Sequence, residues 1–409
     1  MKIKVFIALL FVSNAVCGQD ARTEQWQADL ITYQQELEKR HIDLFHQIDK
    51  THFANELNTL RDSVEHLSDW EIAVSLMRLT RKIGDGHTAV STTNWDAHSF
   101  PIAVKKFGDE WRLVKVPKAH SDMLGASLET IDGMNIAEIE RKLSTVAQYV
   151  ENTHSETVRI GNYLPIGELL YALQITESPN RAVFGLRTDE GKTARLALST
   201  LSKEASAQFK YNHVTAKSAA VEKPLDNKFD YLWYSIIAGK NATYIRFDSY
   251  PPFEEMVSFA EQLLVFVDEN QTRQLVIDLR NNGGGDLYVG LVLANALNLV
   301  DNVDWKDGVY VLTSAVTFSA GASNAALFRQ LLNAKIVGTP TGSNPTGYQD
   351  MGDFILPNSN LRITYSKRLF RLQETATNGL LPDLYLEQNW VDFAIGKDNV
   401  LDNVIEMLH

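Results

Sequence analysis

The sequence predicts a mixed α/β protein whose second half forms a mostly parallel sheet. From Ala242 onward, short apolar runs typical of buried strands alternate with longer segments of helical periodicity. Such alternation requires crossover connections between strands, which indicate a parallel sheet covered by helices. The 409 residues, 44% hydrophobic and 22% charged, are typical of a globular chain of two or three domains.

Residues 1–18 have the composition of a secretory signal peptide. Two lysines precede an apolar run over 5–12, and small residues follow up to Gly18. Cleavage near Gly18 leaves an exported protein, periplasmic or extracellular, without cysteine, because Cys17 is the only one in the chain. A lipid anchor at Cys17 is disfavoured because the branched Val16 precedes it, where bacterial lipoprotein signals have a small residue.

The net charge of the chain argues against two classes of partner. It is −12, and removing residues 1–18 takes away two lysines and no acid, so the mature chain carries −14. An acidic surface disfavours nucleic acid and anionic lipid as partners. No later segment has eighteen consecutive apolar residues, so we expect no transmembrane segment.

Residues 19–95 are expected to form an N-terminal helical domain. Apolar side chains recur at helical spacing through most of this region, which favours about three helices. His41, His46 and His52 could suggest a metal cluster. Their spacings of five and six do not place them on one helix face, so we predict no metal site.

The helical domain ends in the segment GDGHT, residues 84–88. Two glycines bracket an aspartate just before His87, and a β-branched run follows, so the segment indicates a tight loop that enters a strand. A lone histidine in a loop is more often a polar surface residue than a catalytic one. His87 therefore needs support from other parts of the chain.

Residues 96–225 are expected to form a small α+β module followed by a linker. The patterns predict strands at 111–116 and 128–135, the second ending in an Asp-Gly turn, helices over 136–149 and 164–175, and two strands within 181–198. The polar stretch from Ser202 onward indicates the linker.

Residues 226–409 contain the alternating pattern. The expected strands lie at 244–247, 275–279, 309–312 and 336–337, the expected helices at 253–267, 287–299 and 320–332, and an antiparallel pair at 354–356 and 361–365. Three loops at the ends of these strands carry the unusual residues, and sites on such sheets tend to form there.

Ser319 follows the strand at 309–312 and precedes the helix at 320–332. The first N–H groups of a helix have no intrahelical partner and favour negative charge, so a nucleophile there has oxyanion donors beside it. The string Thr317 to Gly321 matches only half of the nucleophile-elbow motif, which argues against that hydrolase fold. Small residues at a helix start also serve simply as caps and close packing.

The loop Asp278 to Asp286 contains three successive glycines after a buried strand. They are needed where the backbone turns sharply or lets another group approach closely. No Gly-Lys-Ser or Gly-Lys-Thr follows, so a nucleotide-binding loop is disfavoured. The N–H groups of this loop could instead face an oxyanion.

Five ordered motifs together resemble one peptidase family. They are GDGHT at 84–88, LGASLETIDG at 124–133, DLRNNGGG at 278–285, the segment around Ser319, and GTPTG at 338–342. The family comprises the serine peptidases that include the tail-specific, or C-terminal processing, proteases and the tricorn-protease core. The resemblance implies a ClpP/crotonase-like spiral catalytic domain at 226–409 and a degenerate PDZ-like module within 96–225.

The resemblance also implies the catalytic residues. The family's nucleophile matches Ser319. Tail-specific proteases activate it with a lysine twenty-five residues later, but that position here is Asn344. Tricorn-like members use a histidine from the segment before the PDZ-like part, which matches His87, although Gly86 stands where they have a serine. A neutral imidazole suits the removal of a serine proton.

The third catalytic residue that we predict is a late glutamate, Glu374, with Asp85 and Asp383 as further candidates. Backbone N–H groups of Gly284 and Ala320 are the expected oxyanion donors. The implied function is an exported serine peptidase that hydrolyses peptide bonds through an acyl-enzyme, with a polypeptide substrate and neither cofactor nor metal. Two alternatives stay open: an esterase or amidase at the same site, and a non-catalytic ligand-binding protein on the same fold.

Overall fold

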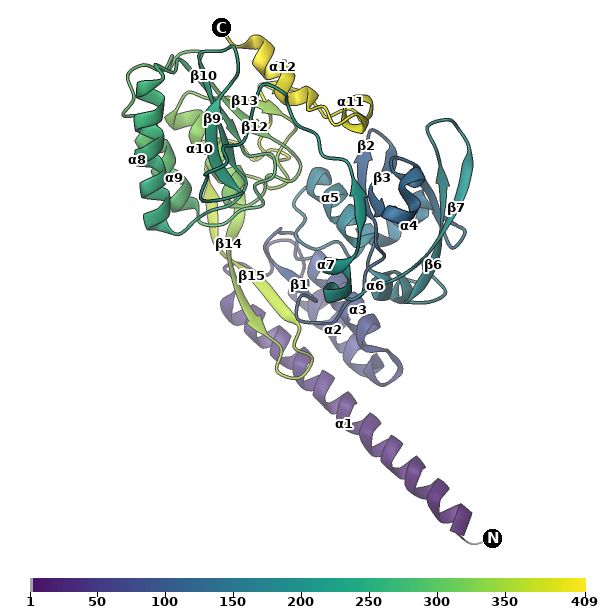
Figure 1. Ribbon diagram of the computed structural model, residues 1–409. Helices are drawn as coiled ribbons and strands as arrows, with labels where there is room; N and C mark the ends of the chain where they lie inside the picture. Colours follow the sequence, from purple (N-terminus) through teal and green to yellow (C-terminus); the bar gives the residue numbers. More distant parts are fainter. Residues whose placement is uncertain (1–2) are drawn as a thin grey trace.

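The computed structural model describes the backbone of residues 3–409 and the side chains from Asp20 onward. The predicted signal peptide, residues 1–18, and Cys17 therefore lie outside the residues whose side chains are described. Two lobes lie side by side, and a long β-hairpin reaches from one to the other (Figure 1). No helix in the described part of the chain is long and apolar enough to span a bilayer.

Three N-terminal helices confirm the prediction for this region. They are α1 (Ile3–Arg40), α2 (Lys50–Ser63), which continues into the short 3₁₀ helix η1 (Val64–His66), and α3 (Asp69–Arg81). A capping box between Ser68 and Glu71 begins α3 and satisfies its first N–H groups. The predicted apolar faces are buried, including Leu30, Tyr33, Leu37, Leu57, Leu60 and Leu76.

An antiparallel sheet of seven strands forms the centre of the same lobe. Its order is β2-β3-β4-β6-β7, with β5 paired to β4 and β8 to β3. The strands are β2 (Ala103–Phe107), β3 (Glu110–Pro117), β4 (Ser127–Ile131), β5 (Met134–Asn135), β6 (Arg181–Arg187), β7 (Thr193–Ser199) and β8 (Tyr211–His213).

The helices of this lobe differ from the prediction in two places. They are η2 (Lys118–Met123), α4 (Ile136–Ser144), α5 (Thr153–Tyr163), α6 (Gly167–Ala172) and α7 (Lys203–Gln208). The pattern did not predict α5, whose buried residues are mostly small: a Cβ at Gly161 would lie 3.2 Å from the Val104 carbonyl of β2. The stretch predicted as a linker contains α7 and β8.

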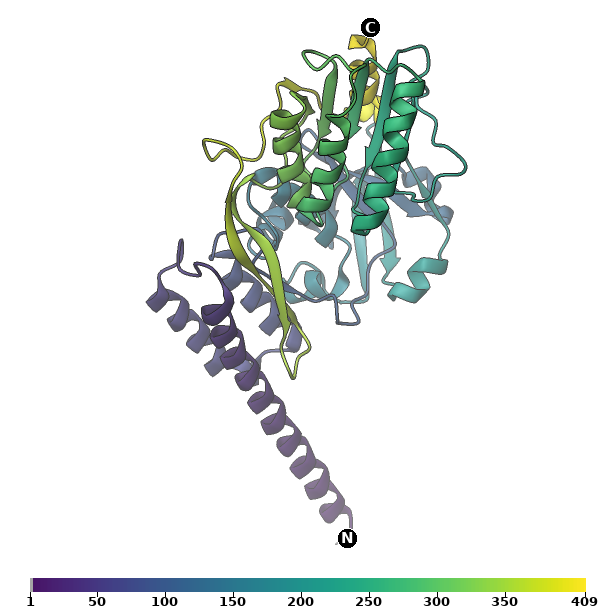
Figure 2. The same cartoon turned by 90° about the vertical axis from the view of Figure 1, so that its left-hand side faces the viewer.

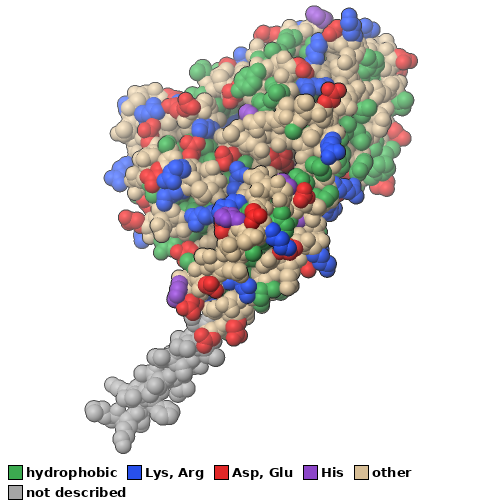
Figure 3. Space-filling model, turned by 180° about the vertical axis from the view of Figure 1, so that it is seen from behind, with side chains coloured by type: hydrophobic (Ala, Val, Ile, Leu, Met, Phe, Trp, Pro, Cys, Tyr) green, Lys and Arg blue, Asp and Glu red, His purple; other side chains and the backbone are tan. Residues whose placement is uncertain are grey.

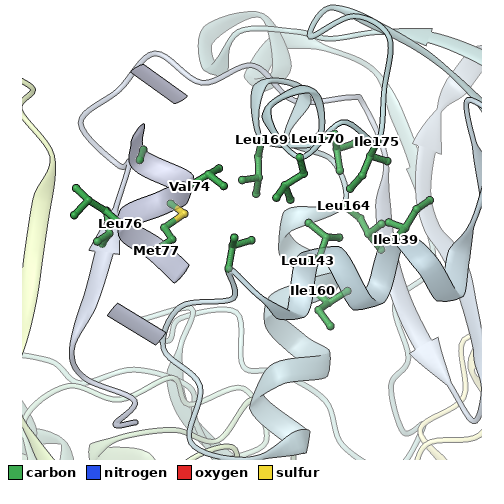
Figure 4. Close-up of a cluster of buried hydrophobic side chains, with 14 of the residues drawn as sticks. Val74, Leu76, Met77, Ile139, Leu143, Ile160, Leu164, Leu169, Leu170 and Ile175 are labelled. Carbon is green, nitrogen blue, oxygen red and sulfur yellow. The ribbon is translucent and has the colours of Figure 1, made fainter. Parts of the chain in front are cut away.

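The N-terminal helices and the antiparallel sheet share one hydrophobic core. Figure 4 shows Val74 and Met77 of α3 facing Leu169 and Leu170 of α6, with Leu143 of α4 close by. Three helices without a sheet bury little apolar surface alone, so joining the neighbouring core stabilises them. Residue 95, the predicted boundary, therefore does not separate two hydrophobic cores.

The second lobe is built on a six-stranded sheet of order β16-β13-β12-β11-β10-β9. Only β9 (Leu232–Ile236) is antiparallel to its neighbour, and the parallel strands are β10 (Ala242–Phe247), β11 (Gln274–Asp278), β12 (Val309–Thr313), β13 (Lys335–Gly338) and β16 (Leu384–Tyr385). The predicted mostly parallel sheet is confirmed.

Helices cover both faces of this sheet. On one face lie α8 (Phe253–Glu269), α9 (Leu287–Leu297) and α10 (Ala320–Leu331), side by side in Figure 2. The C-terminal α12 (Asn399–Met407) packs on the other face, preceded by α11 (Trp390–Ala394). The carboxyl ends of β11 and β12 therefore meet at one edge, where a site can form.

A long hairpin connects the two lobes. It consists of β14 (Thr346–Ile355) and β15 (Arg362–Arg371), longer than the antiparallel pair predicted at 354–356 and 361–365. Its far end reaches the N-terminal helices (Figures 1 and 2), where Ile363 joins their core. There β15 also pairs with β1 (Ala89–Ser91), the strand that follows the GDGHT loop.

Candidate active site

Ser319 lies in a strained turn between β12 and α10. Its φ of 51° and ψ of −126° belong to a region that residues with a side chain rarely adopt. Strain of this kind costs roughly 1–3 kcal/mol and persists only where the surroundings enforce it. The Ser319 N–H donates to the Ser343 hydroxyl at 2.6 Å, which helps to hold the turn.

The turn is bound to the glycine loop that follows β11. The Thr317 hydroxyl donates to the Leu279 carbonyl at 2.8 Å, and the Phe318 N–H donates to the Asn282 carbonyl at 2.9 Å. The side chain of Asn282 is fully buried and donates to the Phe247 carbonyl at 2.9 Å. Backbone and side-chain bonds thus fix the nucleophile to the carboxyl ends of two buried strands.

A buried ion network anchors the start of the glycine loop. Arg280 bridges Asp278, at the end of β11, and Asp398, which caps α12. Burial opposes the ionisation of Asp278, but the neighbouring guanidinium of Arg280 outweighs it and lowers the pKa of Asp278 to about 2. The pair therefore remains charged and ties the loop to the C-terminal helix.

Glycine is required at position 284 because the loop touches the nucleophile. Its φ is +109°, and a Cβ there would lie 2.7 Å from Ser319 Cβ. The Gly284 N–H donates to the Asn282 side-chain oxygen at 3.0 Å, so one predicted oxyanion donor already has an acceptor. The other, the Ala320 N–H, is the first of α10 and has no acceptor within the helix.

The structure brings His87 to Ser319 across 232 residues of sequence. His87 Nε2 lies 2.9 Å from Ser319 Oγ, within hydrogen-bonding distance, so the two residues that the resemblance implied are in contact. The imidazole is 2% exposed, and its ring centroid lies 5.4 Å from that of Phe318. A buried imidazole beside a serine hydroxyl can accept the serine proton.

The carboxylate that faces the other side of the imidazole is Glu151. Its Oε1 lies 3.2 Å from His87 Nδ1, and its side chain is 5% exposed. The two atoms are within ion-pairing distance but out of line for a hydrogen bond, so their contact is electrostatic in this structure. A carboxylate there favours the tautomer with the proton on Nδ1, which leaves Nε2 free to accept from Ser319.

The structure does not bring the predicted glutamate to the histidine. Glu374 is exposed on the segment after β15 and contacts neither Ser319 nor His87. Asp383 accepts the Ile336 N–H at 2.8 Å, at the edge of the six-stranded sheet. Of the three acids that the sequence suggested, only Asp85 lies close to His87, and it contacts the backbone of His87 instead of its ring.

Gly86 explains how Glu151 reaches the imidazole. A Cβ at Gly86 would overlap Glu151 Cγ, so any other residue there would displace the carboxylate. Tricorn-like members have a serine at this position, whereas this chain requires a residue without a side chain there.

Asp85 organises the loop that carries His87. Its Oδ1 accepts the N–H groups of His87 and Thr88 at 2.9 and 2.8 Å, and the Ser366 hydroxyl at 2.7 Å. Its Oδ2 faces His41 Nε2 at 2.9 Å. Burial disfavours its ionisation, but hydrogen bonds from His41 and Ser366 outweigh burial and lower the pKa of Asp85 to about 2.

Asn344, at the position where tail-specific proteases have a lysine, has a structural role. Its N–H donates to Glu151 Oε2 at 2.6 Å, and its side-chain oxygen accepts the Gly379 N–H at 2.6 Å. It thereby fixes the carboxylate that faces His87.

Among the described residues, no three His, Cys, Asp or Glu side chains are grouped so as to hold a metal ion.

Sequence reasoning missed Glu151 because nothing near it in the sequence marks a site. It lies at the end of an irregular segment, and the helix after it has no strong apolar stripe. One signal was present: Asn152 and Ser155 form a capping box at the start of α5. A helix start there would have placed an acidic side chain at a turn.

Three comparisons set this site among known proteins. No protein-family model matches the chain, and no curated protein does. The structure matches those of S41-family peptidases. Mature CPAF is similar over 94% of this chain and 97% of its own, with 14% identity and a TM-score of 0.68.

A second structure, of mature CPAF complexed with lactacystin, is similar over 95% of this chain and 98% of its own, with 13% identity and a TM-score of 0.65. The tricorn protease is similar over 93% of this chain and 36% of its own, with 13% identity and a TM-score of 0.45. At these identities the comparisons show a shared mixed α/β fold with an N-terminal helical region.

Proposed function

We propose that this protein is a serine peptidase that cleaves peptide bonds through an acyl-enzyme, with Ser319 as nucleophile and His87 as general base. The observation that carries the proposal is the 2.9 Å contact between His87 Nε2 and Ser319 Oγ at a strained strand-to-helix turn. Strained backbone clusters at functional sites, and a buried serine–histidine contact is what an activated nucleophile requires. The shared fold of the S41 peptidases supports the same reaction class.

The proposed steps follow from these contacts. Ser319 Oγ bonds to the substrate carbonyl carbon while its proton passes to His87 Nε2. The tetrahedral adduct collapses, the C–N bond breaks, and His87 returns the proton to the leaving amine. Water then attacks the acyl-enzyme by the reverse sequence, with His87 again accepting and returning a proton.

Two further groups support these steps in the proposal. Glu151 is a positioning residue: it orients His87 through Nδ1 and stabilises the imidazolium that forms. The N–H groups of Ala320 and Gly284 stabilise the oxyanion, and Gly284 then shares its proton between the oxyanion and the Asn282 side chain. In this proposal Glu151 replaces Glu374 as the acid that orients His87.

We also infer the finer architecture and the location of the protein. The parallel strands β10 to β13 with helices α8 to α10 support a ClpP/crotonase-like spiral domain. The motif at 124–133 spans β4 and its turn, which supports the PDZ-like assignment. The lysines and apolar run of residues 1–18 support export to the periplasm or the extracellular space, with a polypeptide as substrate.

An active-site probe tests the proposal directly. A fluorophosphonate probe should label the wild-type protein, and mass spectrometry should find the adduct on Ser319. The Ser319→Ala variant is the control and should not be labelled. Labelling with hydrolysis of aryl esters and no cleavage of peptides would favour an esterase or amidase, whereas no labelling would favour a ligand-binding protein.

A further inference from the structure

Three of the seven tryptophans of the chain line one hollow of about 400 Å³. They come from three segments: Trp26 from α1, Trp70 from the first turn of α3, and Trp95 from the loop after β1. The tip of the β14–β15 hairpin forms another side of the hollow. No lining residue belongs to the candidate active site, so the hollow is a separate feature of the molecule.

Packing explains two of the three tryptophans. The ring of Trp95 is nearly perpendicular to the other two, at 78° to Trp26 and 83° to Trp70. The indole N–H of Trp26 donates to Asp69 at 2.8 Å, and that of Trp95 donates to the Ser359 carbonyl at 2.7 Å. Trp70 is only half-buried, and its indole N–H donates to no described residue. Trp70 therefore offers a ring and a donor that the fold itself does not use.

Polar groups without a partner surround these rings. The carboxylate of Asp96 and the side-chain amide of Gln25 are exposed and bond to no residue in the described part of the chain. Asn358 donates through its amide nitrogen to Asp29 and to the Gln25 carbonyl, and its side-chain oxygen accepts from no described group. The hollow thus combines free acceptors and free donors beside aromatic rings.

This combination of groups disfavours a charged ligand. The one cation in the lining, Arg22, is paired with Asp69. An ammonium group has no acceptor, so a cation would leave the donors of Gln25 and Trp70 unused. An anion would meet the carboxylates of Asp69 and Asp96. A hydroxyl group both donates and accepts, so a ligand rich in hydroxyls can bond to both kinds of group.

A second hollow, of about 800 Å³, meets the first at Trp70, which lines both. It contains Tyr171, which is 51% exposed. On the face shown in Figure 3 acidic and basic side chains are interspersed, whereas the lining of the second hollow has five acidic residues and neither Lys nor Arg. Glu71, Asp132 and Glu168 accept hydrogen bonds from backbone N–H groups of the protein itself. The second hollow therefore repels anions, and three of its carboxylates are already occupied.

A neutral saccharide matches both hollows. The C–H bonds on one face of a pyranose ring carry partial positive charge and pack against the negative face of an aromatic ring. The hydroxyls around the pyranose ring supply the donors and acceptors that the polar groups lack. Hollows of about 300–1,000 Å³ with aromatic walls and a few polar groups are typical of small-ligand sites.

We propose that the hollow between α1, α3 and the hairpin tip binds a pyranose unit of a neutral oligosaccharide. Trp70 stacks on the C–H face of the sugar, and Asp96 and Gln25 bond to its hydroxyls. The oligosaccharide continues past Trp70 into the second hollow, toward Tyr171. This binding function is additional to the proposed peptidase and does not depend on it.

Calorimetric titration of the full chain with oligosaccharides tests this inference without requiring catalysis. The neutral probes are the hexasaccharides of the cello, malto, manno and N-acetylated chito series, each beside its monosaccharide. Hexagalacturonate is the anionic probe and hexalysine the cationic one, all in about 0.5 M NaCl to screen exposed charges. At least one neutral hexasaccharide should bind with a Kd below about 1 mM and about 10-fold more tightly than its monosaccharide. Both charged probes should bind more weakly than that hexasaccharide.

Two substitutions locate the binding. Trp70→Ala should raise the Kd by about 10-fold or more, because a stacked aromatic ring is lost. Asp96→Ala should raise it by about three- to tenfold, the value of one hydrogen bond. The matched controls are Trp305→Ala, at a half-buried tryptophan of the other lobe, and Asp109→Ala, at an exposed acid in the turn between β2 and β3. Both controls should keep the wild-type Kd.

The outcomes do not depend on whether Ser319 is labelled by the fluorophosphonate, so the two proposals fail separately. Weaker binding in Trp70→Ala and Asp96→Ala, with both controls unchanged, supports the inference. Because Trp70 also packs against Trp95, Asp96→Ala decides the matter if Trp70→Ala lowers the melting temperature. No binding of any neutral hexasaccharide, unchanged binding in both variants, or tighter binding of hexagalacturonate or hexalysine overturns it.

Discussion

Ser319 and His87 meet at 2.9 Å, but the backbone around each of them is held by different forces. Ser319 belongs to one continuous unit, in which β12 is buried along its whole length and α10 begins at the next residue. Packing and backbone hydrogen bonds enforce a turn that is strained by itself. This side of the site is a property of one segment and the loop beside it.

The other side is assembled from five separate segments of the chain. His87 rests on a loop whose centre is the buried carboxylate of Asp85, which contacts His41 and Ser366. The carboxylate beside the imidazole, Glu151, is held in turn by the N–H of Asn344. Charge and hydrogen bonds in a poorly solvated region, where they are strong but costly to disrupt, replace the packing of the other side.

The difference between the two sides predicts how each responds to substitution. Changes at the nucleophile should remove chemistry and leave the fold, because its turn is enforced from outside. Changes on the histidine side should affect chemistry and stability together, because the same groups supply both.

The largest effect is expected for Ser319→Ala. Hydrolysis should fall by on the order of 10³-fold or more, since removing one member of a catalytic unit removes most of its contribution. The melting temperature should stay the same, because among the residues whose side chains are described the hydroxyl bonds to His87 alone. Activity of Ser319→Ala near that of wild type would refute the assignment.

Ser319→Gly sharpens the comparison because it is equally inactive but relieves the backbone. Strain of roughly 1–3 kcal/mol is removed, and about 0.5–1 kcal/mol of added chain entropy opposes the gain. The glycine variant should therefore melt at a higher temperature than the alanine variant. Equal melting temperatures would mean that the strain is no larger than the opposing chain entropy of about 0.5–1 kcal/mol.

His87→Ala should lower kcat by about 10²- to 10⁴-fold with a much smaller change in KM, since general-base assistance acts on the transition state. Steady-state kinetics on one peptide substrate measure both constants. A matched control is His98→Ala, because His98 is also paired with a glutamate, Glu168, at 2.8 Å. That control should stay within about twofold of wild type. An equal loss at both positions would indicate general destabilisation.

Glu151→Gln should lower kcat by about 10- to 100-fold. The expected loss is smaller than for an aligned orienting carboxylate, because the 3.2 Å contact with His87 is out of line for a hydrogen bond. Glu374→Gln, at an exposed position, should change kcat by less than about twofold. The reverse result, with Glu374→Gln the damaging change, would restore the acid that the sequence suggested.

Glu151 and Glu374 show where sequence reasoning failed, whereas the parallel sheet and Ser319 show where it succeeded. The alternation after Ala242 predicted the parallel sheet, and the strand-to-helix transition predicted the position of Ser319, because both patterns are local. Local patterns of this kind are visible in a sequence. His87 was identified only because five motifs together resemble a peptidase family, and the structure places its Nε2 2.9 Å from Ser319 Oγ.

The remaining parts of the site depend on contacts that no local pattern contains. Glu151 reaches His87 because Gly86 leaves space and because β15 and Asn344 bring distant segments together. The helix α5 was missed since it packs through small residues such as Gly161 and lacks an apolar stripe.

Asp85→Asn should destabilise the protein more than it slows the chemistry. The pKa of Asp85 is lowered from 3.8 to about 2, so its carboxylate contributes roughly 2 kcal/mol when ionised. Because the folded value lies below the unfolded one, this stability is complete above about pH 4 and is lost as the pH falls through about 2. Denaturant melts over this range measure the contribution.

The asparagine variant should therefore lose most of this acid-dependent stability. Asn cannot accept from every donor that Asp85 faces: His41 Nδ1 accepts the Asp43 N–H, so a neutral His41 carries its proton on Nε2, toward Asp85. The side-chain NH2 group of the asparagine variant would face one of these donors, and two donors cannot form a hydrogen bond. Equal pH dependence of the two proteins between about pH 4 and 2 would mean that Asp85 is not the group that titrates.

The smallest effect of a site substitution is expected at Asn344, the position that matches the catalytic lysine of tail-specific proteases. Its contact with Glu151 is made by the backbone N–H, which Asn344→Ala keeps, and only the acceptor for the Gly379 N–H is lost. One such hydrogen bond contributes about 0.5–1.5 kcal/mol to the free energy of unfolding. Because the contact with Glu151 is kept, kcat should stay within about threefold of wild type.

Asn344→Lys should not raise kcat, because Ser319 already contacts the base His87. Steady-state kinetics of both variants beside Ser319→Ala measure this directly. If Asn344→Ala were as damaging as Ser319→Ala, Asn344 would itself be catalytic, and the assignment of His87 as the base would be wrong.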